Sequence, residues 1–138
     1  MSKYKTIKTE IRTLDSLKKA LADLDITPEI AVDPKVPSIP LIGYRGDTRP
    51  ELASVAIRRN QVNRFSGGAS NDIGFAWDGQ GYQAIISDYD STASLSLFNQ
   101  VKQRYAYHEI CRQAHAKGYT VRETTQANGV VRVVLAHR

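Results

Sequence analysis

The stretch Gln103-Arg104-Tyr105-Ala106-Tyr107-His108 lies inside the strongest helical segment of the chain, which covers residues 96–117. A helix of that length is roughly 30 Å long, and Gly118 is predicted to end it because glycine is common just past a helix C-terminus. Side chains two residues apart on a helix point about 200° apart. Tyr105 is therefore predicted to enter the core, whereas Tyr107 is predicted to lie on another side, against its own helix or against a partner.

A shorter helix and a set of strands complete the expected fold. Leucines recur at three- and four-residue spacing from Leu14 to Leu24, which indicates a helix over residues 14–24. Prolines exclude helix between residues 28 and 40, and the remaining segments show the composition and turn signals of strands. Strands are predicted at residues 3–11, 29–32, 39–45, 51–59, 73–77, 82–87, 119–124 and 130–137. This order predicts an α+β fold, a mostly antiparallel sheet with both helices packed on one face.

Two of the strands carry specific predictions about burial. Trp77 shares a strand face with Ile73 and Phe75, so its ring is predicted to be substantially buried. In the strand at 51–59, the residues predicted to share one face are Ala53, Val55 and Ile57.

Composition narrows the class of protein. The 138 residues fit a single domain, and 41% hydrophobic with 24% charged residues is enough apolar material for one core. The apolar runs are too short to span a bilayer, which needs about 20 apolar residues. One cysteine, Cys111, cannot form an internal disulfide, which suits a reducing compartment and predicts a cytoplasmic protein. Neither a GxGxxG nor a GxxxxGK motif is present, which excludes nucleotide binding by those devices.

Five stretches resemble a known family over nearly the whole chain. They are Ile7-Lys8-Thr9-Glu10-Ile11, Ile42-Gly43-Tyr44-Arg45-Gly46, Asp72-Ile73-Gly74-Phe75-Ala76-Trp77-Asp78-Gly79, Gln100-Val101-Lys102-Gln103-Arg104-Tyr105-Ala106-Tyr107-His108 and Gly129-Val130-Val131-Arg132-Val133-Val134. The family is the hypothetical chloroplast reading frame thirty-five of cyanobacteria and plastids of red-algal type, a domain of unknown function. No catalytic residue is established for the family, so the resemblance carries none over to this chain, and no cofactor is expected. The partner is expected to be a protein of unknown identity, for which the resemblance offers an AAA-type ATPase as one candidate.

The chain departs from that family at residues 58–70, which look longer than the family's compact turn. Glycine, serine, asparagine and arginine dominate here, so a flexible, solvated loop is predicted. Its basic and aromatic residues are Arg58, Arg59, Arg64 and Phe65. Arginine can contact phosphate and phenylalanine can stack on a base, and the net charge of +5 would favour such a ligand. The loop is therefore either a nucleic-acid-binding segment or an ordinary solvated loop.

Three possible metal ligands share one face of the long helix. His108, Cys111 and His115 lie at i, i+3 and i+7, and imidazole and thiolate both bind zinc. A fourth ligand would have to be His137 on the last strand. The competing interpretation is that His108 and Cys111 continue the apolar stripe at the edge of the core.

Catalytic candidates are weaker still. Four carboxylates flank the central hairpin: Asp72, Asp78, Asp88 and Asp90. They could serve as an acid–base pair or simply form the turns of the hairpin.

The outward face of the long helix would present Gln103, Arg104 and Tyr107, and arginine with tyrosine is typical of protein interfaces. The sequence thus favours a non-enzymatic binding or adaptor protein acting through protein–protein contacts. The alternatives are a nucleic-acid-binding domain and, third, a small metal-binding or hydrolytic protein.

Overall fold

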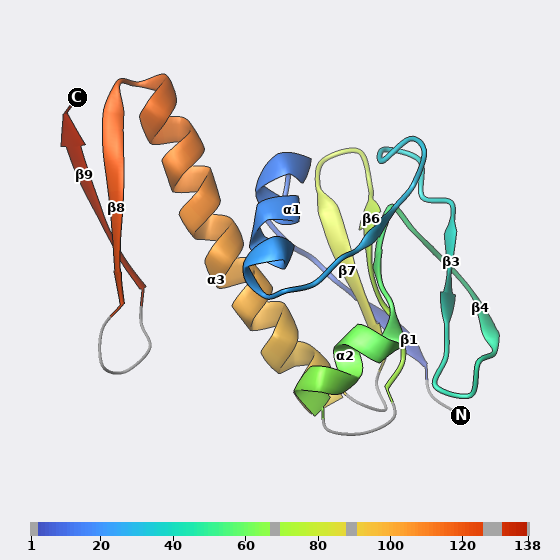
Figure 1. The fold of residues 1–138 in the computed structure, drawn as a ribbon. Coiled ribbons are helices and arrows are strands. Elements are labelled where there is room, and N and C mark those ends of the chain that lie inside the picture. The colour runs from blue at the N-terminus through green and yellow to red at the C-terminus, as the bar shows by residue number, and fades with distance from the viewer. Residues whose placement is uncertain (1–2, 67–69, 88–90, 126–130, 138) are drawn as a thin grey trace.

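The computed structural model describes residues 3–66, 70–87, 91–125 and 131–137 (Figure 1). In chain order the elements are β1 (Tyr4–Ile7), α1 (Leu14–Asp23), β2 (Glu29–Ile30), β3 (Ile39–Ile42), β4 (Thr48–Ala53), β5 (Val55–Ile57), α2 (Arg59–Ser66), β6 (Ile73–Trp77), β7 (Tyr82–Ser87), α3 (Ser91–Ala116), β8 (Tyr119–Thr125) and β9 (Val131–His137). A five-stranded sheet has the order β1-β7-β6-β5-β2, and all of its neighbouring pairs are antiparallel. β3 pairs with β4, and β8 with β9. The predicted α+β class is confirmed.

The main core lies between the sheet and the helices. Leu17 and Leu21 of α1 are fully buried, as the leucine spacing predicted, and they join Phe75 of β6 and Leu97 of α3 in one cluster. Val62 of α2 belongs to the same cluster. Within the described residues the face of the sheet is therefore lined by three helices rather than the two expected, and the prediction missed α2.

The opposite face of the sheet is covered by the β3–β4 pair. Leu41, Ala53, Ala56 and Ile85 form this second, smaller cluster. Gly74 allows the close approach, because a Cβ at that position would lie 3.0 Å from the Cβ of Ala53 and 3.0 Å from a methyl group of Leu41. The two layers thus enclose the sheet between helices and a β-hairpin.

The predicted strand at 51–59 is in fact two strands. β4 ends at Ala53 and β5 begins at Val55, with Ser54 between them. The backbone N–H of Ser54 donates to the carbonyl of Phe75, and the hydroxyl of Ser54 accepts from the N–H of Trp77. This break turns Ala53 to the β3–β4 side, whereas Val55 faces the helices. The prediction that Ala53 and Val55 share a face is wrong for that reason.

The loop predicted at 58–70 is also wrong over most of its length, because residues 59–66 form α2. The first N–H of this helix, that of Arg59, donates to the carboxylate of Asp72 at 2.7 Å. Val62 is fully buried and Phe65 packs against the core. A cap from a distant residue and two apolar contacts thus stabilise a helix that its composition does not favour. Residues 67–69 lie outside the described residues.

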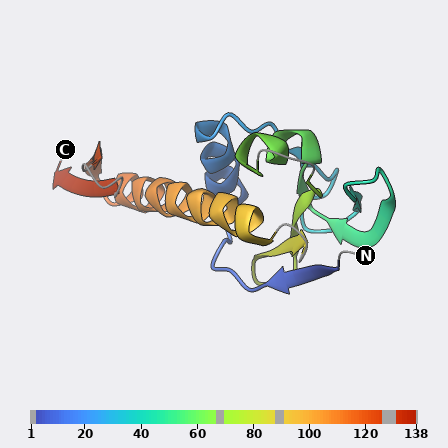
Figure 2. The same ribbon diagram turned by 90° about the horizontal axis from the view of Figure 1, so that it is seen from below.

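α3 contacts different parts of the protein along its 26 residues. Leu97, Val101 and Tyr105 are buried against the body. Farther along, Ala114 is buried again, but it lies on the opposite side of the helix from Val101, because 13 steps of 100° bring it about 140° away. Figures 1 and 2 show the reason: the second half of α3 extends beyond the body and carries the β8–β9 hairpin on its far side.

The C-terminus of α3 and the pairing of the last two strands agree with the sequence predictions. Gly118 has φ +84°, a left-handed conformation that glycine adopts without strain, and it follows the last turn of α3. β8 and β9 pair in register from Tyr119 opposite His137 to Thr125 opposite Val131. Among the described helices, α3 is the longest, and neither it nor α1 or α2 carries an apolar stretch that could span a bilayer.

Trp77 lies on the predicted face of β6 but is only half-buried. Its ring centroid is 4.9 Å from that of Tyr82, and the ammonium group of Lys35 lies 5.1 Å from the ring centroid on the outside. Trp77 is the last residue of its strand, so it packs against the margin of the core instead of entering it.

Candidate functional site

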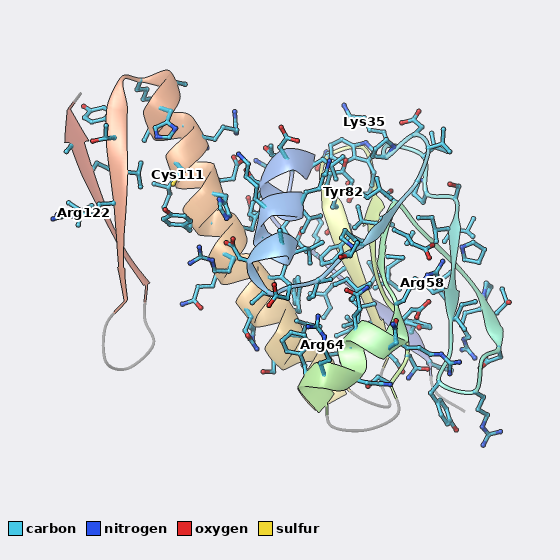
Figure 3. All side chains as sticks on the ribbon, in the orientation of Figure 1. Lys35, Arg58, Arg64, Tyr82, Cys111 and Arg122 are labelled. Atoms are coloured by element: carbon cyan, nitrogen blue, oxygen red, sulfur yellow. The ribbon has the colours of Figure 1, made fainter. Side chains whose placement is uncertain are left out.

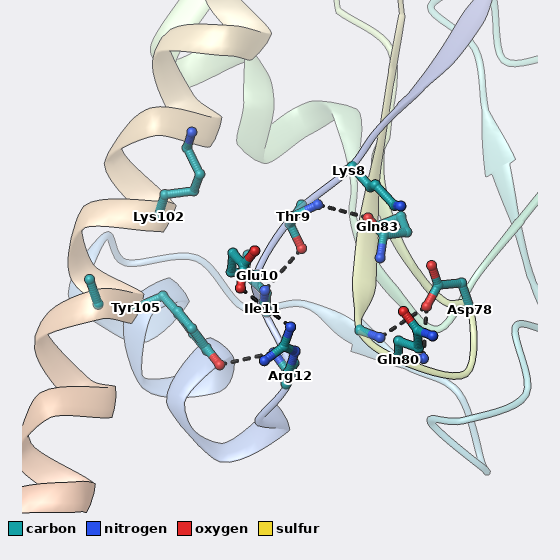
Figure 4. A pocket seen from close by; sticks show the side chains of 12 residues that line it. Lys8, Thr9, Glu10, Ile11, Arg12, Asp78, Gln80, Gln83, Lys102 and Tyr105 are labelled. Atoms are coloured by element: carbon teal, nitrogen blue, oxygen red, sulfur yellow. Dashed lines mark hydrogen bonds and ion pairs between the residues drawn. The ribbon is translucent and has the colours of Figure 1, made fainter.

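A pocket of about 480 Å³ lies where the segment after β1, the β6–β7 turn and α3 meet (Figure 4). It is lined by Lys8, Thr9, Glu10, Ile11, Arg12, Asp78, Gln80, Gly81, Gln83, Lys102, Tyr105 and Ala106. Three of the stretches that carry the family resemblance contribute to this lining: residues 7–11, 72–79 and 100–108. Sequence reasoning missed the pocket, because these stretches are far apart along the chain and only the fold joins them.

Tyr105 connects the pocket to the packing of the helices. The ring is buried, with 8% of its surface exposed, as predicted. Its hydroxyl oxygen accepts hydrogen bonds from the backbone N–H groups of Arg12 at 2.9 Å and Thr13 at 3.0 Å. Since Thr13 immediately precedes α1, this phenol fixes the start of α1 against α3.

The wall formed by the segment after β1 is held by side-chain hydrogen bonds. The N–H of Thr9 donates to Oε1 of Gln83 at 2.7 Å, and its hydroxyl donates to the carbonyl of Tyr82 at 2.6 Å. The same hydroxyl accepts from the N–H of Ile11 at 3.0 Å. These bonds attach an irregular segment to β7, so the backbone that lines the pocket is held in place without regular strand pairing.

Asp78 forms the β6–β7 turn. Its carboxylate accepts hydrogen bonds from the N–H groups of Gln80 and Gly81, both at 2.9 Å, and these bonds lower the pKa of Asp78 below its ordinary value. A carboxylate held ionised by turn N–H groups acts as a turn former, which is the simpler of the two interpretations offered above.

Asp72 has a structural position as well. Its side chain is fully buried, and its oxygens accept from the N–H of Ile42 at 2.8 Å, the N–H of Arg59 at 2.7 Å and Nη1 of Arg58 at 2.7 Å. The carboxylate thereby joins β3, the end of β5 and the start of α2. Asp88 and Asp90, the other two carboxylates considered for acid–base chemistry, lie outside the described residues.

The four residues considered for nucleic-acid binding are each engaged with a different part of the protein. Arg58 bonds Glu29 at 2.5 Å as well as Asp72, and these carboxylates raise its pKa. Nη1 of Arg59 donates to the carbonyl of Tyr44 at 2.6 Å. Nη2 of Arg64 donates to the carbonyl of Asp25 at 2.7 Å, while Phe65 packs on the core. As Figure 3 shows for Arg58 and Arg64, the fold does not gather these side chains on one free surface.

The three possible zinc ligands of α3 have different surroundings. Nε2 of His108 lies 2.6 Å from Oδ2 of Asp23 on α1, an oxygen that also accepts from Nε of Arg104 at 2.8 Å. Although burial opposes it, these two partners keep the pKa of Asp23 below its ordinary value. Cys111 lies on the side of α3 that faces the hairpin (Figure 3), and His115 is exposed. Across residues with described side chains, no three His, Cys, Asp or Glu residues are placed to hold a metal ion; the side chain of His137 lies outside that set.

The residues predicted for partner binding fall into two groups. Arg104 bonds Asp23, and its guanidinium carbon lies 4.7 Å from the ring centroid of Tyr107, which is half-buried. Gln103 is exposed and borders a shallow, open depression. The depression is lined by Leu95, Ser96, Asn99, Gln100 and Gln103. The structure therefore joins Arg104 to Tyr107 and places Gln103 on an adjoining polar surface.

Comparison with known proteins gives a family but no activity. The model of a protein family of unknown function, DUF1257, matches residues 20–134. The uncharacterised protein ycf35 of Guillardia theta is 32% identical over 98% of this chain and 96% of its own length, and that of Pyropia yezoensis is 23% identical over 98% and 96%. No solved structure matches the chain. This chain is thus similar to the ycf35 proteins, which confirms the family predicted from the sequence, and it belongs to the DUF1257 family of proteins of unknown function.

Proposed function

We propose that this chain is a non-enzymatic binding module, which engages a protein partner through the outer face of α3 and the adjoining β8–β9 hairpin. The outer face of α3 is defined here by Ser96, Asn99, Gln100 and Gln103, which lie on the first half of the helix, next to the arm formed by its second half and the hairpin. The observation that carries the proposal is the projection of the second half of α3 beyond the body, where the described residues cover it with a two-stranded hairpin (Figures 1 and 2). An isolated two-stranded hairpin is marginally stable in water, so additional contacts would stabilise this arm.

Apolar side chains on the arm support the same proposal. Ile110 of α3 is 41% exposed and Leu135 of β9 is 50% exposed. Each one alone is ordinary for a protein surface, but both lie on the projecting part, where the body does not cover them. A partner that covered this arm would bury both side chains, and the hydrophobic effect would favour the contact.

The side chains on the outer face of α3 indicate what kind of partner surface would complement it. Serine, asparagine and glutamine side chains both donate and accept hydrogen bonds, and none of the four carries a charge. A polar, uncharged surface that presents donors and acceptors would complement them better than a strongly charged one. The partner is unidentified, and the AAA-type ATPase offered as a candidate by the family resemblance is the first one to test.

Binding to nucleic acid receives less support. The net charge of +5 favours it, but Arg58, Arg59 and Arg64 already donate to protein oxygens. A nucleic-acid site that used these arginines would have to break those bonds. Measuring the salt dependence of DNA binding separates the two functions, because each phosphate contact adds close to one to the slope of log affinity against log salt.

Site-specific photo-crosslinking tests the proposal. A benzophenone amino acid replaces Gln103 on α3 in cells that express the chain, and a matched variant carries it at Asn63, an exposed residue of α2. We expect one discrete adduct at position 103 that unlabelled wild-type protein competes away, and no such adduct at position 63. Adducts of equal yield and composition at the two positions would contradict a specific site on α3.

A further inference from the structure

We propose that the pocket of Figure 4 binds a small molecule through an oxyanion group, a phosphate or a carboxylate. This site is distinct from the protein-binding surface proposed above, and it would make the chain a ligand-responsive protein as well as a binding module. The pocket charge, the hydrogen-bonding state of Tyr105 and the size of the cavity support it independently.

The charge in the pocket is not balanced. Lys8, Arg12 and Lys102 line it together with only two carboxylates, Glu10 and Asp78. Glu10 is 3.4 Å from Arg12 and Asp78 is occupied by the turn N–H groups. Across the described residues, no carboxylate pairs with Lys8, from the segment after β1, or with Lys102 of α3, whose ammonium group lies 5.0 Å from the ring centroid of Phe98. An anion in the pocket would be attracted by this excess positive charge, and either ammonium group supplies a donor for a charge-assisted hydrogen bond.

Tyr105 supplies a donor that the protein itself does not use. Its oxygen accepts two backbone hydrogen bonds, which occupy both of its acceptor positions. The hydroxyl proton must then be donated elsewhere, and among the described residues no acceptor receives it. A buried phenol that lacks an acceptor for its proton is unfavourable, so an oxygen of a ligand in the pocket would stabilise it.

The size and lining of the pocket indicate more than a bare ion. A volume of about 480 Å³ lies within the range of sites for small organic molecules. Ile11, Ala106 and the ring of Tyr105 add apolar surface to the polar groups. The ligand is therefore a metabolite-sized molecule with an oxyanion at one end and a less polar remainder that packs against these side chains.

The test uses inorganic phosphate and acetate as separate probes of the oxyanion site. Each is titrated into ¹⁵N-labelled full-length protein at constant ionic strength, with chloride as the replaced anion, and backbone amide shifts are recorded. We expect saturable shifts at Thr9, Gly81 and Ala106. Tighter binding of phosphate would indicate an organic phosphate as the ligand, and tighter binding of acetate would indicate a carboxylate.

Two variants distinguish the pocket from general attraction of anions to a basic protein. Lys8→Gln with Lys102→Gln should weaken the probe affinity about tenfold or more, because both positive charges without a carboxylate partner are removed from the pocket lining. Lys18→Gln with Lys19→Gln, two exposed residues of α1, removes the same charge away from the pocket and should leave the affinity within about twofold. The proposal is overturned if neither probe gives saturable shifts at the pocket amides, or if both double variants weaken binding equally.

Discussion

Nη1 of Arg58 lies 2.7 Å from Oδ2 of Asp72, whose side chain is completely removed from solvent. Arg58 is itself mostly covered, and it reaches Glu29 and the carbonyl of Pro40 as well. A buried carboxylate that loses its cation is left with an uncompensated charge, which is far more costly than the loss of a surface ion pair. The pair therefore supports the junction of β3, β5 and α2.

We expect Arg58→Ala to lower the free energy of unfolding by about 3–5 kcal/mol, measured by urea denaturation at neutral pH. Arg64→Ala is the matched control, because Arg64 is exposed and donates one hydrogen bond to a backbone carbonyl. That control should lose about 1 kcal/mol or less. Equal losses for the two variants would show that the buried pair contributes no more than a surface bond.

Substitution of Trp77 tests whether its side chain is only partly buried. Because its ring packs on Tyr82 but remains half-exposed, Trp77→Ala should cost about 2 kcal/mol. Phe75 lies on the same strand and is fully buried, so Phe75→Ala should cost about 3–5 kcal/mol. The two unfolding curves give the comparison directly, and a Trp77 variant as destabilised as the Phe75 variant would place the tryptophan in the core.

Glu109 predicts a pH dependence of stability. Hydrogen bonds from Arg112 first, and from Ser16 and Thr13, lower its pKa to about 2, against an ordinary value of 4.5. The folded state thus favours the ionised carboxylate, and the stabilisation is fully present at pH values above the ordinary pKa, which the unfolded chain retains. It is lost as the pH falls through the folded pKa.

The stability difference between wild type and Glu109→Gln should therefore be constant above about pH 5 and shrink toward zero near pH 2. Urea denaturation of both proteins across that range measures it. A difference that stays constant down to pH 2 would mean that the carboxylate has the same pKa in both states.

Removal of metal should have no effect on stability. His108 is bound to Asp23, and across the part of the chain with described side chains no cluster is placed to hold a metal ion. Incubation with a chelator should leave the melting temperature unchanged, because a structural zinc ion would contribute directly to folding. Stoichiometric zinc in protein purified without added metal, together with a lower melting temperature after chelation, would support the His108, Cys111 and His115 site instead.

Local sequence signals were sufficient for the elements with strong periodicity. The leucines of α1, the β6–β7 hairpin with its turn at Asp78, and the glycine that follows α3 each appear in the structure as the sequence predicts. In each case the residues that determine the conformation lie within the element or directly beside it. Family membership was likewise predicted from contiguous stretches.

The features that sequence reasoning missed depend on residues far apart in the chain. α2 is capped by Asp72, which follows it, and Gln61 exchanges hydrogen bonds with the backbone of Thr27 before it. The pocket needs Tyr105 beside the segment after β1. The arginines of α2 looked solvated because their acceptors, such as the carbonyls of Tyr44 and Asp25, are backbone atoms that no side-chain pattern marks.

The most direct measurement is retention of the protein partner by a variant with a charged outer face of α3. Asn99→Glu with Gln103→Glu places two negative charges on exposed positions, and Asn60→Glu with Asn63→Glu makes the matched change on α2. Both proteins should melt within a few degrees of wild type, because exposed substitutions alter stability by about 0.5 kcal/mol or less.

The affinity for the partner identified by crosslinking is then measured by calorimetry. We expect the α3 variant to bind about tenfold or more weakly and the α2 variant to bind within about twofold of wild type. Equal affinity of the two variants would contradict the proposal that this chain binds its partner through α3.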